Sequence, residues 1–221
     1  MAATKKRRSR RKKKARKKAV LIVILIILAL ITVAAVLIIT NWRRIVNKAE
    51  DLLPSAFTYP TEYEEYVVKY SKEYNTDPVL VYAVIKTESS FDPKAESEVG
   101  ARGLMQLMEE AFYWLKFRLQ DKRDIDFDSM YDPKTNIQYG TYYLSFLMEH
   151  YDNNIELTAA AYHGGIGAVD GWIESGKINK SSFDASQIPE GNEKTAEYVR
   201  RIRKAYNKYK EILKDKKIIT K

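Results

Sequence analysis

The chain has 221 residues, enough for one domain of ordinary size and an additional segment. Its formal net charge of +9 is concentrated at one end, because 12 of the 38 Lys and Arg residues lie between Lys5 and Lys18 and no acidic residue precedes Glu50. The remaining 26 basic and 29 acidic residues leave a net charge of −3, so we expect no nucleic-acid partner for the main domain. With no cysteine and only two histidines, disulfides and thiolate chemistry are excluded, and we expect neither a metal site nor a cofactor.

An apolar segment follows the basic cluster. Residues 20–40 carry no charge and have the length, about 20 residues, that a helix needs to cross the hydrocarbon core of a bilayer. This run is longer than the apolar part of a cleaved signal peptide, and the small residues at 33–35 that could form a cleavage site lie inside it. Because positive residues stay on the cytoplasmic side, we expect a basic cytoplasmic tail at 1–18, a single-pass transmembrane helix at 19–41, and an extracytoplasmic remainder.

The segment after the span lacks a regular pattern and is followed by the first helix signal. Residues 42–60 are expected to be a stalk, because Pro54 and Pro60 interrupt any helix or strand. The stretch from Thr61 to Glu64 fits a capping box, in which the threonine accepts a hydrogen bond from the first turn and the glutamate reaches back.

Three further helix starts carry capping side chains. Asp77 and Asp132 each precede a proline, and Asn154 precedes an apolar stretch. Helices are predicted from Pro78 to about Ser89, from Pro133 to about Tyr151, from Asn154 through Tyr162, and from Lys194 to about Lys214, the last with Tyr198, Ile202, Ala205 and Tyr209 at helical spacing. Strand signals are few, and any small sheet would fall between Phe91 and Leu107. The prediction is an all-α, mainly helical domain at 61–215 with a short tail at 216–221.

Glu88 ends one of these predicted helices, after an apolar turn. A carboxyl group in such a place can be partly desolvated, and desolvation raises its pKa because it disfavours the charged form. A carboxylic acid that is protonated near neutral pH is suited to donate a proton to a glycosidic oxygen. The residue is therefore a candidate general acid, with a solvated or capping glutamate as the alternative.

Four sequence blocks, the first of which contains this glutamate, occur in a characteristic order. They are Thr87-Glu88-Ser89-Ser90-Phe91-Asp92-Pro93, then Ser97 with Gly100-Ala101-Arg102-Gly103-Leu104-Met105-Gln106-Leu107-Met108, later Ala160-Ala161-Tyr162-His163-Gly164-Gly165-Ile166-Gly167-Ala168-Val169, and near the end Tyr198-Val199-Arg200-Arg201-Ile202. Their order and spacing resemble the lytic transglycosylases of the soluble lytic transglycosylase (SLT) type, within the lysozyme-like superfamily. The resemblance covers roughly Tyr63 to Tyr209.

The resemblance implies a role for each matching position. Glu88 matches the single catalytic acid/base, and Ser97 matches a serine near the bond that is cut. Gln106 and Met108 match residues that line the substrate cleft. Tyr162 matches the tyrosine whose hydroxyl faces the catalytic glutamate, and His163, which follows it, is expected to contact substrate.

The chain departs from the family pattern at three positions. His163 stands where the family has an asparagine, and Glu109 stands where it has a proline. Lys194 occupies the position of a late family glutamate, with Glu193 and Glu197 close by as replacements between which the sequence does not decide.

The function implied is cleavage of the bond between N-acetylmuramic acid and N-acetylglucosamine in peptidoglycan, with formation of a 1,6-anhydro end. The expected partners are peptidoglycan glycan strands and the cell membrane, with proteins of the cell-wall machinery as further candidates. Two alternatives stay open: a muramidase-type hydrolase on the same fold, with Asp92, Glu96 or Glu98 as a second carboxylate, and a non-catalytic peptidoglycan-binding scaffold.

Overall fold

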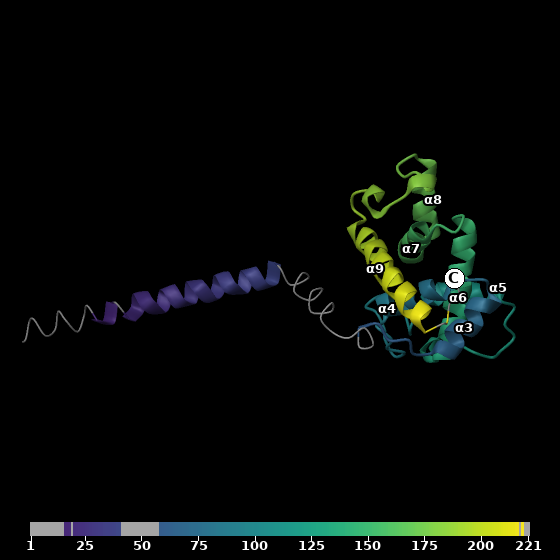
Figure 1. Ribbon diagram of the computed structural model, residues 1–221, viewed down its shortest axis with the longest axis horizontal. Helices are drawn as coiled ribbons and strands as arrows, with labels where there is room; N and C mark the ends of the chain where they lie inside the picture. Colours follow the sequence, from purple (N-terminus) through teal and green to yellow (C-terminus); the bar gives the residue numbers. More distant parts are fainter. Residues whose placement is uncertain (1–15, 19, 41–57, 217, 219–221) are drawn as a thin grey trace, which may run out of the picture. The chain divides into compact units, whose positions relative to one another are not determined.

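The computed structural model describes residues 16–18, 20–40, 58–216 and 218, and it divides into a unit Met1–Thr58 and a compact unit Tyr59–Lys221 (Figure 1). Most of the expected basic tail and stalk, and most of the C-terminal tail, lie outside the described residues. The first unit contains a helix, Arg16–Thr40, that is long and apolar enough to cross a membrane as judged by length and composition. The expectation of an apolar N-terminal helix is confirmed.

The second unit is built from helices. In chain order these are α3 (Glu64–Glu73), α4 (Pro78–Glu88), α5 (Glu109–Arg118), η1 (Phe127–Tyr131), α6 (Pro133–His150), α7 (Ile155–Gly164), α8 (Ile166–Glu174), η2 (Lys180–Ser182), η3 (Ala185–Gln187) and α9 (Glu193–Asp215). In the described part of the chain, β-pairing is limited to two isolated bridges that join Glu96 to Arg102 and Arg102 to Leu107. They fall where the sequence placed any small sheet, and the all-α prediction is confirmed.

Side chains cap three of the helices as predicted. Asp77 accepts a hydrogen bond from the backbone N–H of Val79 at 2.9 Å, and Asp132 accepts one from Thr135 at 2.9 Å. Asn154 accepts bonds from the N–H groups of Glu156 and Leu157, in the first turn of α7, at 3.0 and 3.1 Å. Each such bond satisfies a donor that the helix itself cannot pair, which typically contributes about 1 kcal/mol.

The predicted capping box at Thr61 is wrong. Helix α3 begins at Glu64, and its N-cap is Tyr63, which has a left-handed backbone (φ 59°) and makes no capping bond. The Thr61 carbonyl instead accepts a hydrogen bond from the hydroxyl of Tyr82 in α4. Contacts with the packed domain therefore decide how the chain enters α3, and the local pattern is overridden.

Helices α5 and α8 were not predicted. Helix α5 places apolar side chains on both of its faces, with Phe112 and Leu115 buried and Tyr113 and Phe117 exposed. A helix of this kind lacks the one-sided apolar stripe by which amphipathic helices are recognised. Helix α8 follows directly from the Gly164-Gly165 turn, which sequence patterns assign to a loop.

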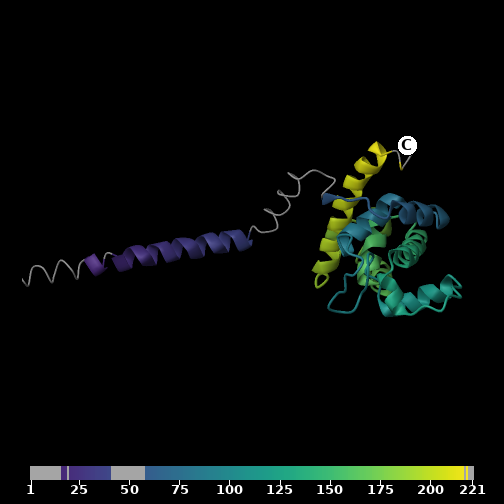
Figure 2. The ribbon, with the colours of Figure 1, turned by 90° about the horizontal axis from the view of Figure 1, so that it is seen from below.

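The largest helix interface joins α4 and α9, and α9 also packs against α7 (Figures 1 and 2). Helix α4 is apolar around nearly its whole circumference, and its residues 79–85 are all buried. The predicted apolar face of α9 is confirmed, because Tyr198, Ile202, Ala205 and Tyr209 are buried. Burial of each large apolar side chain contributes about 1.5–3 kcal/mol, so this interface is a main source of the stability of the domain.

A second, smaller apolar cluster lies under α5. It consists of Leu107, Phe112, Leu115, Phe127, Met130 and Tyr139. Tyr143 of α6 and Tyr162 of α7 pack against both this cluster and the main core. The two tyrosines therefore mark the junction of the two halves of the domain.

Candidate active site

Glu88 is the last residue of α4, and its side chain is only partly exposed. Burial raises the pKa of Glu88 to about 7, and this effect outweighs the opposing influence of a hydrogen bond from Tyr198 and of the charge on Arg201. A substantial fraction of the side chain is therefore a neutral acid at neutral pH. This confirms the environment that the apolar turn before Glu88 had suggested.

The hydroxyl of Tyr198 donates to Glu88 Oε1 at 2.7 Å. Tyr198 lies in the second turn of α9 and is itself buried, which raises the pKa of its hydroxyl well above the usual value and keeps it a donor. On the next turn, Arg201 Nη2 donates to the carbonyl of Thr87 at 2.8 Å. Helix α9 thus holds the end of α4 at two points and supplies a hydrogen bond that stabilises the carboxylate form of Glu88.

The loop after Glu88 is attached to α4 and α6 by side chains that bond to its backbone. Ser89 Oγ donates to the carbonyl of Leu104 at 2.8 Å. Buried Asn136 accepts from the N–H of Met105 at 2.8 Å and donates to the carbonyls of Arg102 and Met130 at 3.0 and 2.9 Å. Asn136 was missed by the sequence reasoning, because nothing in its local pattern separates it from an ordinary helical asparagine.

Gly103 is the point at which this loop comes closest to η1 and α6. Its φ is +75°, and a Cβ atom there would lie 2.0 Å from the Met130 carbonyl oxygen and 2.4 Å from Asn136 Nδ2. Gly100 also has a positive φ, +84°, but a Cβ atom there would meet nothing within 4 Å. At position 103 the close approach of other backbone and side-chain atoms requires glycine. At position 100 only the left-handed backbone conformation favours it.

Ser97 lies in the tight turn before Gly100. Its Oγ accepts from the N–H of Ala101 at 2.9 Å, and its own N–H donates to the Ala101 carbonyl at 2.9 Å. A hydroxyl that accepts in this way can still donate its hydrogen. The serine therefore shapes the loop and keeps a donor for a ligand.

Gln106 braces the other end of the same loop. Its Nε2 donates to the carbonyls of Ala95 and Gly103, both at 3.0 Å, and its backbone has a left-handed φ of 47°. Met108 is the N-cap of α5 and is 38% exposed. The Gln106 side-chain amide therefore holds the loop together, while Met108 presents an apolar surface.

Tyr162 lies at the junction of the two clusters, and its hydroxyl donates to the carbonyl of Met105 at 2.7 Å. The negative charge of Glu88 adds to the burial that raises the pKa of Tyr162, so the two side chains are near one another. The resemblance had implied that the Tyr162 hydroxyl faces the glutamate. In the structure, the tyrosine that donates to Glu88 is Tyr198, which the sequence placed on the apolar face of the last helix and in the last family block but to which it gave no role at the site.

His163 is exposed next to this pair. Its ring packs on the ring of Tyr198 at a centroid distance of 4.8 Å, and its Nδ1 lies 3.1 Å from Thr195 Oγ1. Partial burial and the nearby charges of Arg201 and Lys194 lower the pKa of His163. The imidazole therefore borders the Glu88–Tyr198 pair without bonding to the carboxyl in the described contacts.

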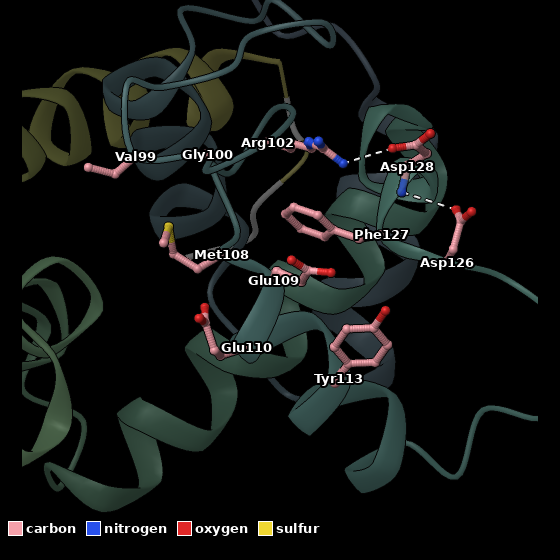
Figure 3. A pocket seen from close by; sticks show the side chains of 10 residues that line it. All are labelled: Val99, Gly100, Arg102, Met108, Glu109, Glu110, Tyr113, Asp126, Phe127 and Asp128. Atoms are coloured by element: carbon pink, nitrogen blue, oxygen red, sulfur yellow. Dashed lines mark hydrogen bonds and ion pairs between the residues drawn. The ribbon is translucent and has the colours of Figure 1, made fainter.

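A pocket of about 370 Å³ opens beside Met108, between the loop and the start of α5. Figure 3 shows the Arg102 guanidinium next to Asp128, with a hydrogen bond of 2.8 Å, and the ring of Phe127 below it at 4.4 Å from the guanidinium carbon. Glu109, at the position where the family has a proline, lines this pocket. Within the described residues, no group of three or more His, Cys, Asp or Glu side chains is arranged to hold a metal ion.

Residues 65–184 match the family described as the Transglycosylase SLT domain. The chain belongs to this family. The domain is 33% identical over 143 residues to the Soluble lytic murein transglycosylase of Salmonella typhimurium, which covers 63% of this chain and 22% of that protein. It is 35% identical over 127 residues to Membrane-bound lytic murein transglycosylase C of Klebsiella pneumoniae, covering 54% and 35%.

A solved structure also shares the fold. The lytic transglycosylase Slt of Pseudomonas aeruginosa, crystallised as an inactive mutant in which glutamine replaces a glutamate, superposes with a TM-score of 0.64 at 25% identity, covering 72% of this chain and 26% of that one. The predicted lysozyme-like SLT fold is confirmed. The chain spans 22–35% of the length of these three relatives.

Proposed function

We propose that this SLT-domain protein is a membrane-anchored lytic transglycosylase that cleaves the β-1,4 bond between N-acetylmuramic acid and N-acetylglucosamine in peptidoglycan. The observation that carries the proposal is the state of Glu88, whose pKa is raised to about 7 while its carboxylate form has a hydrogen-bond donor in Tyr198. A group poised in this way can act first as an acid and then as a base at neutral pH.

The reaction needs one carboxyl group. Glu88 donates its proton to the bridging oxygen as the bond from that oxygen to muramyl C1 breaks, and the bonding electrons leave with the oxygen. The oxocarbenium-like C1 is then attacked by the muramyl O6, and the C6 hydroxyl proton passes to the Glu88 carboxylate. No water is consumed, Glu88 is restored, and the nucleophile has a high effective concentration because it belongs to the same sugar.

The other site residues have supporting roles in this proposal. The Tyr198 hydroxyl stabilises Glu88 while it is a carboxylate, between the two proton transfers. Ser97, Gln106, Met108 and His163 line the path of the sugar strand, and Tyr162 holds the Met105 carbonyl and, through it, the loop. A family member that is inactivated by a glutamate-to-glutamine change agrees with dependence on a single glutamate.

Two of the three candidate second carboxylates, Glu96 and Asp92, have other partners, which favours the lyase over a hydrolase. Glu96 accepts a hydrogen bond from Tyr131 at 2.7 Å, which lowers the pKa of Glu96, and it pairs with Arg102 at 3.5 Å. Asp92 accepts from the N–H of Lys94 at 2.8 Å. A hydrolase would need a second carboxylate to activate water, and these two side chains are engaged in loop structure instead.

The proposed location is the outer face of the cell membrane. Twelve Lys and Arg residues among the first 18 would stay in the cytoplasm, the apolar part of the helix Arg16–Thr40 would span the bilayer as the segment 19–41, and residues 42–60 would link it to the catalytic domain at 61–215. One relative with this domain is named as membrane-bound. The substrate would then be glycan near the membrane surface.

The test is a digest of purified peptidoglycan by the full chain in detergent micelles, analysed by mass spectrometry. Glu88→Gln keeps the size of the side chain and removes the acid, and Glu174→Gln is the matched control because Glu174 is an exposed glutamate at the end of α8. We expect anhydro-ended muropeptides from the parent and the control and none from Glu88→Gln. Reducing ends that disappear in Glu88→Gln would make the protein a hydrolase, and binding without products from any form would make it a scaffold.

A further inference from the structure

Helix α5 exposes a face made of aromatic side chains. Tyr113 is 54% exposed, Trp114 is 37% exposed, and Phe117, one turn later, is 80% exposed. Phe112 and Leu115 on the opposite face are fully buried in the cluster beneath, so Tyr113 and Phe117 are not needed to attach the helix to the core. Three large rings on the solvent side of one helix of ten residues indicate a binding surface.

This face continues into a row of packed rings that leads to the candidate active site. Trp114 contacts Phe146 and Tyr143 of α6 at centroid distances of 5.0 and 6.1 Å, and Tyr143 contacts Tyr162 of α7 at 5.3 Å. Tyr143, Phe146 and Tyr162 are all partly exposed. Tyr162 donates to the carbonyl of Met105, and Ser89, the residue after Glu88, donates to the carbonyl of the adjacent Leu104, so the row begins beside the catalytic candidate and ends on α5.

A cation lies over the outer part of this row. The guanidinium carbon of Arg118 is 5.5 Å from the centroid of the Trp114 ring and 5.4 Å from that of Phe146. The attraction between the cation and both rings orders them, and an exposed guanidinium keeps donors for hydroxyl and amide oxygens. Rings that are fixed in place by their neighbours and bordered by such donors suit a ligand with alternating apolar and polar edges.

We propose that the aromatic row formed by Tyr162, Tyr143, Trp114 and Phe146, together with exposed Phe117 on the same helix as Trp114, binds the part of the peptidoglycan glycan strand that extends away from the bond at Glu88. The inference rests on the proposed function. A polymeric substrate must leave the catalytic site along the surface, and the C–H faces of pyranose rings stack on aromatic rings while their hydroxyl and acetamido groups meet Arg118. A membrane surface fits less well, because exposed Glu109 and Glu110 begin the same helix and would face anionic lipid headgroups.

The test replaces planar aromatic side chains by branched aliphatic ones. Trp114→Leu combined with Phe117→Leu keeps an apolar surface and removes the stacking planes, whereas Trp114→Phe combined with Phe117→Tyr keeps the planes. Each pair is placed in the full chain carrying Glu88→Gln, so that strands are bound and not cut, and binding to uncross-linked glycan strands is measured by co-sedimentation. Phe117→Leu alone is included because so exposed a side chain can be changed without loss of the fold.

We expect affinity for the strands to fall about tenfold in the double leucine variant, by a smaller factor in Phe117→Leu, and to be retained by the ring-keeping pair. Unchanged affinity in both leucine variants would overturn the inference, since leucine serves an apolar protein or lipid partner as well as a ring does. Equal losses in the leucine and ring-keeping pairs would also overturn it. Failure of the proposed function appears separately, as the absence of anhydro products from the parent chain.

Discussion

Glu88 and the loop that follows it are positioned by different kinds of contact. Glu88 ends a helix whose apolar side chains pack against α9, and one tyrosine hydroxyl from α9 reaches its carboxyl group. The loop between Ser89 and Met108 also buries apolar side chains, those of Phe91, Leu104, Met105 and Leu107. Its irregular backbone is held in addition by hydrogen bonds from Ser89, Gln106 and Asn136. Helix packing spreads its energy over many small contacts, whereas the path of the loop backbone depends on a few hydrogen bonds that have strict geometry.

The comparison predicts that the loop tolerates change less well than the helix end. Gly103→Ala should destabilise the domain by roughly 3 kcal/mol, because the new Cβ meets a backbone carbonyl and Asn136 in a left-handed conformation. Gly100→Ala should cost only about 1 kcal/mol, since it has the same kind of φ and open space around it. Denaturant unfolding of both variants in detergent measures the difference, and similar losses would show that conformation, not contact, sets the requirement at Gly103.

The helix end should instead gain stability when its carboxyl is removed. The folded pKa of Glu88, about 7, lies above its ordinary value of 4.5, so the stability associated with protonated Glu88 is present below about pH 4.5 and is lost as the pH rises through 7. Glu88→Gln cannot lose a proton. Relative to the parent, it should therefore be more stable at pH 8 than at pH 4.5, by about 3 kcal/mol.

Thermal or denaturant unfolding of both forms at the two pH values measures this quantity. The difference between the forms isolates Glu88, because the other titrating groups are shared. An equal difference at pH 4.5 and pH 8 would mean that Glu88 has an ordinary pKa, and the acid role proposed for it would lose its basis.

The smallest expected effect is a shift of the pH–rate profile, which should differ between variants of Tyr198 and Tyr162. Tyr198→Phe removes the donor to Glu88 Oε1, and because that bond lowers the pKa of Glu88, its loss should raise the pKa further. Activity that requires protonated Glu88 declines as the pH rises through this pKa, so the alkaline limb of the pH–rate profile should move to higher pH, by up to about one unit. Tyr162→Phe removes a bond to Met105 and should leave that limb near its original position.

Anhydro-product release measured from pH 5 to 9 provides both profiles. A shift in Tyr162→Phe that matches or exceeds the one in Tyr198→Phe would assign the hydroxyl that acts on Glu88 to α7 and not to α9.

Much of the architecture was determined by features close together in the chain. The caps at Asp77, Asp132 and Asn154 bond to N–H groups two or three residues away, so their partners are known as soon as the sequence is read. The apolar spacing of α9 and the apolar turn before Glu88 are equally local. For this reason the helical class, most helix starts and the raised pKa of Glu88 could be predicted.

Tertiary structure alone decided which side chains meet at the site. Tyr198 and Glu88 are 110 residues apart, and Asn136 reaches a loop 31 residues earlier, so neither pairing leaves a local pattern. The capping box predicted at Thr61 does not form, and the Thr61 carbonyl bonds to Tyr82 of α4 instead. Helix α5 was not predicted because apolar residues lie on both of its faces. Hydrogen bonds between distant segments depend on how helices pack, and packing is a property of the whole core, which no short stretch of sequence encodes.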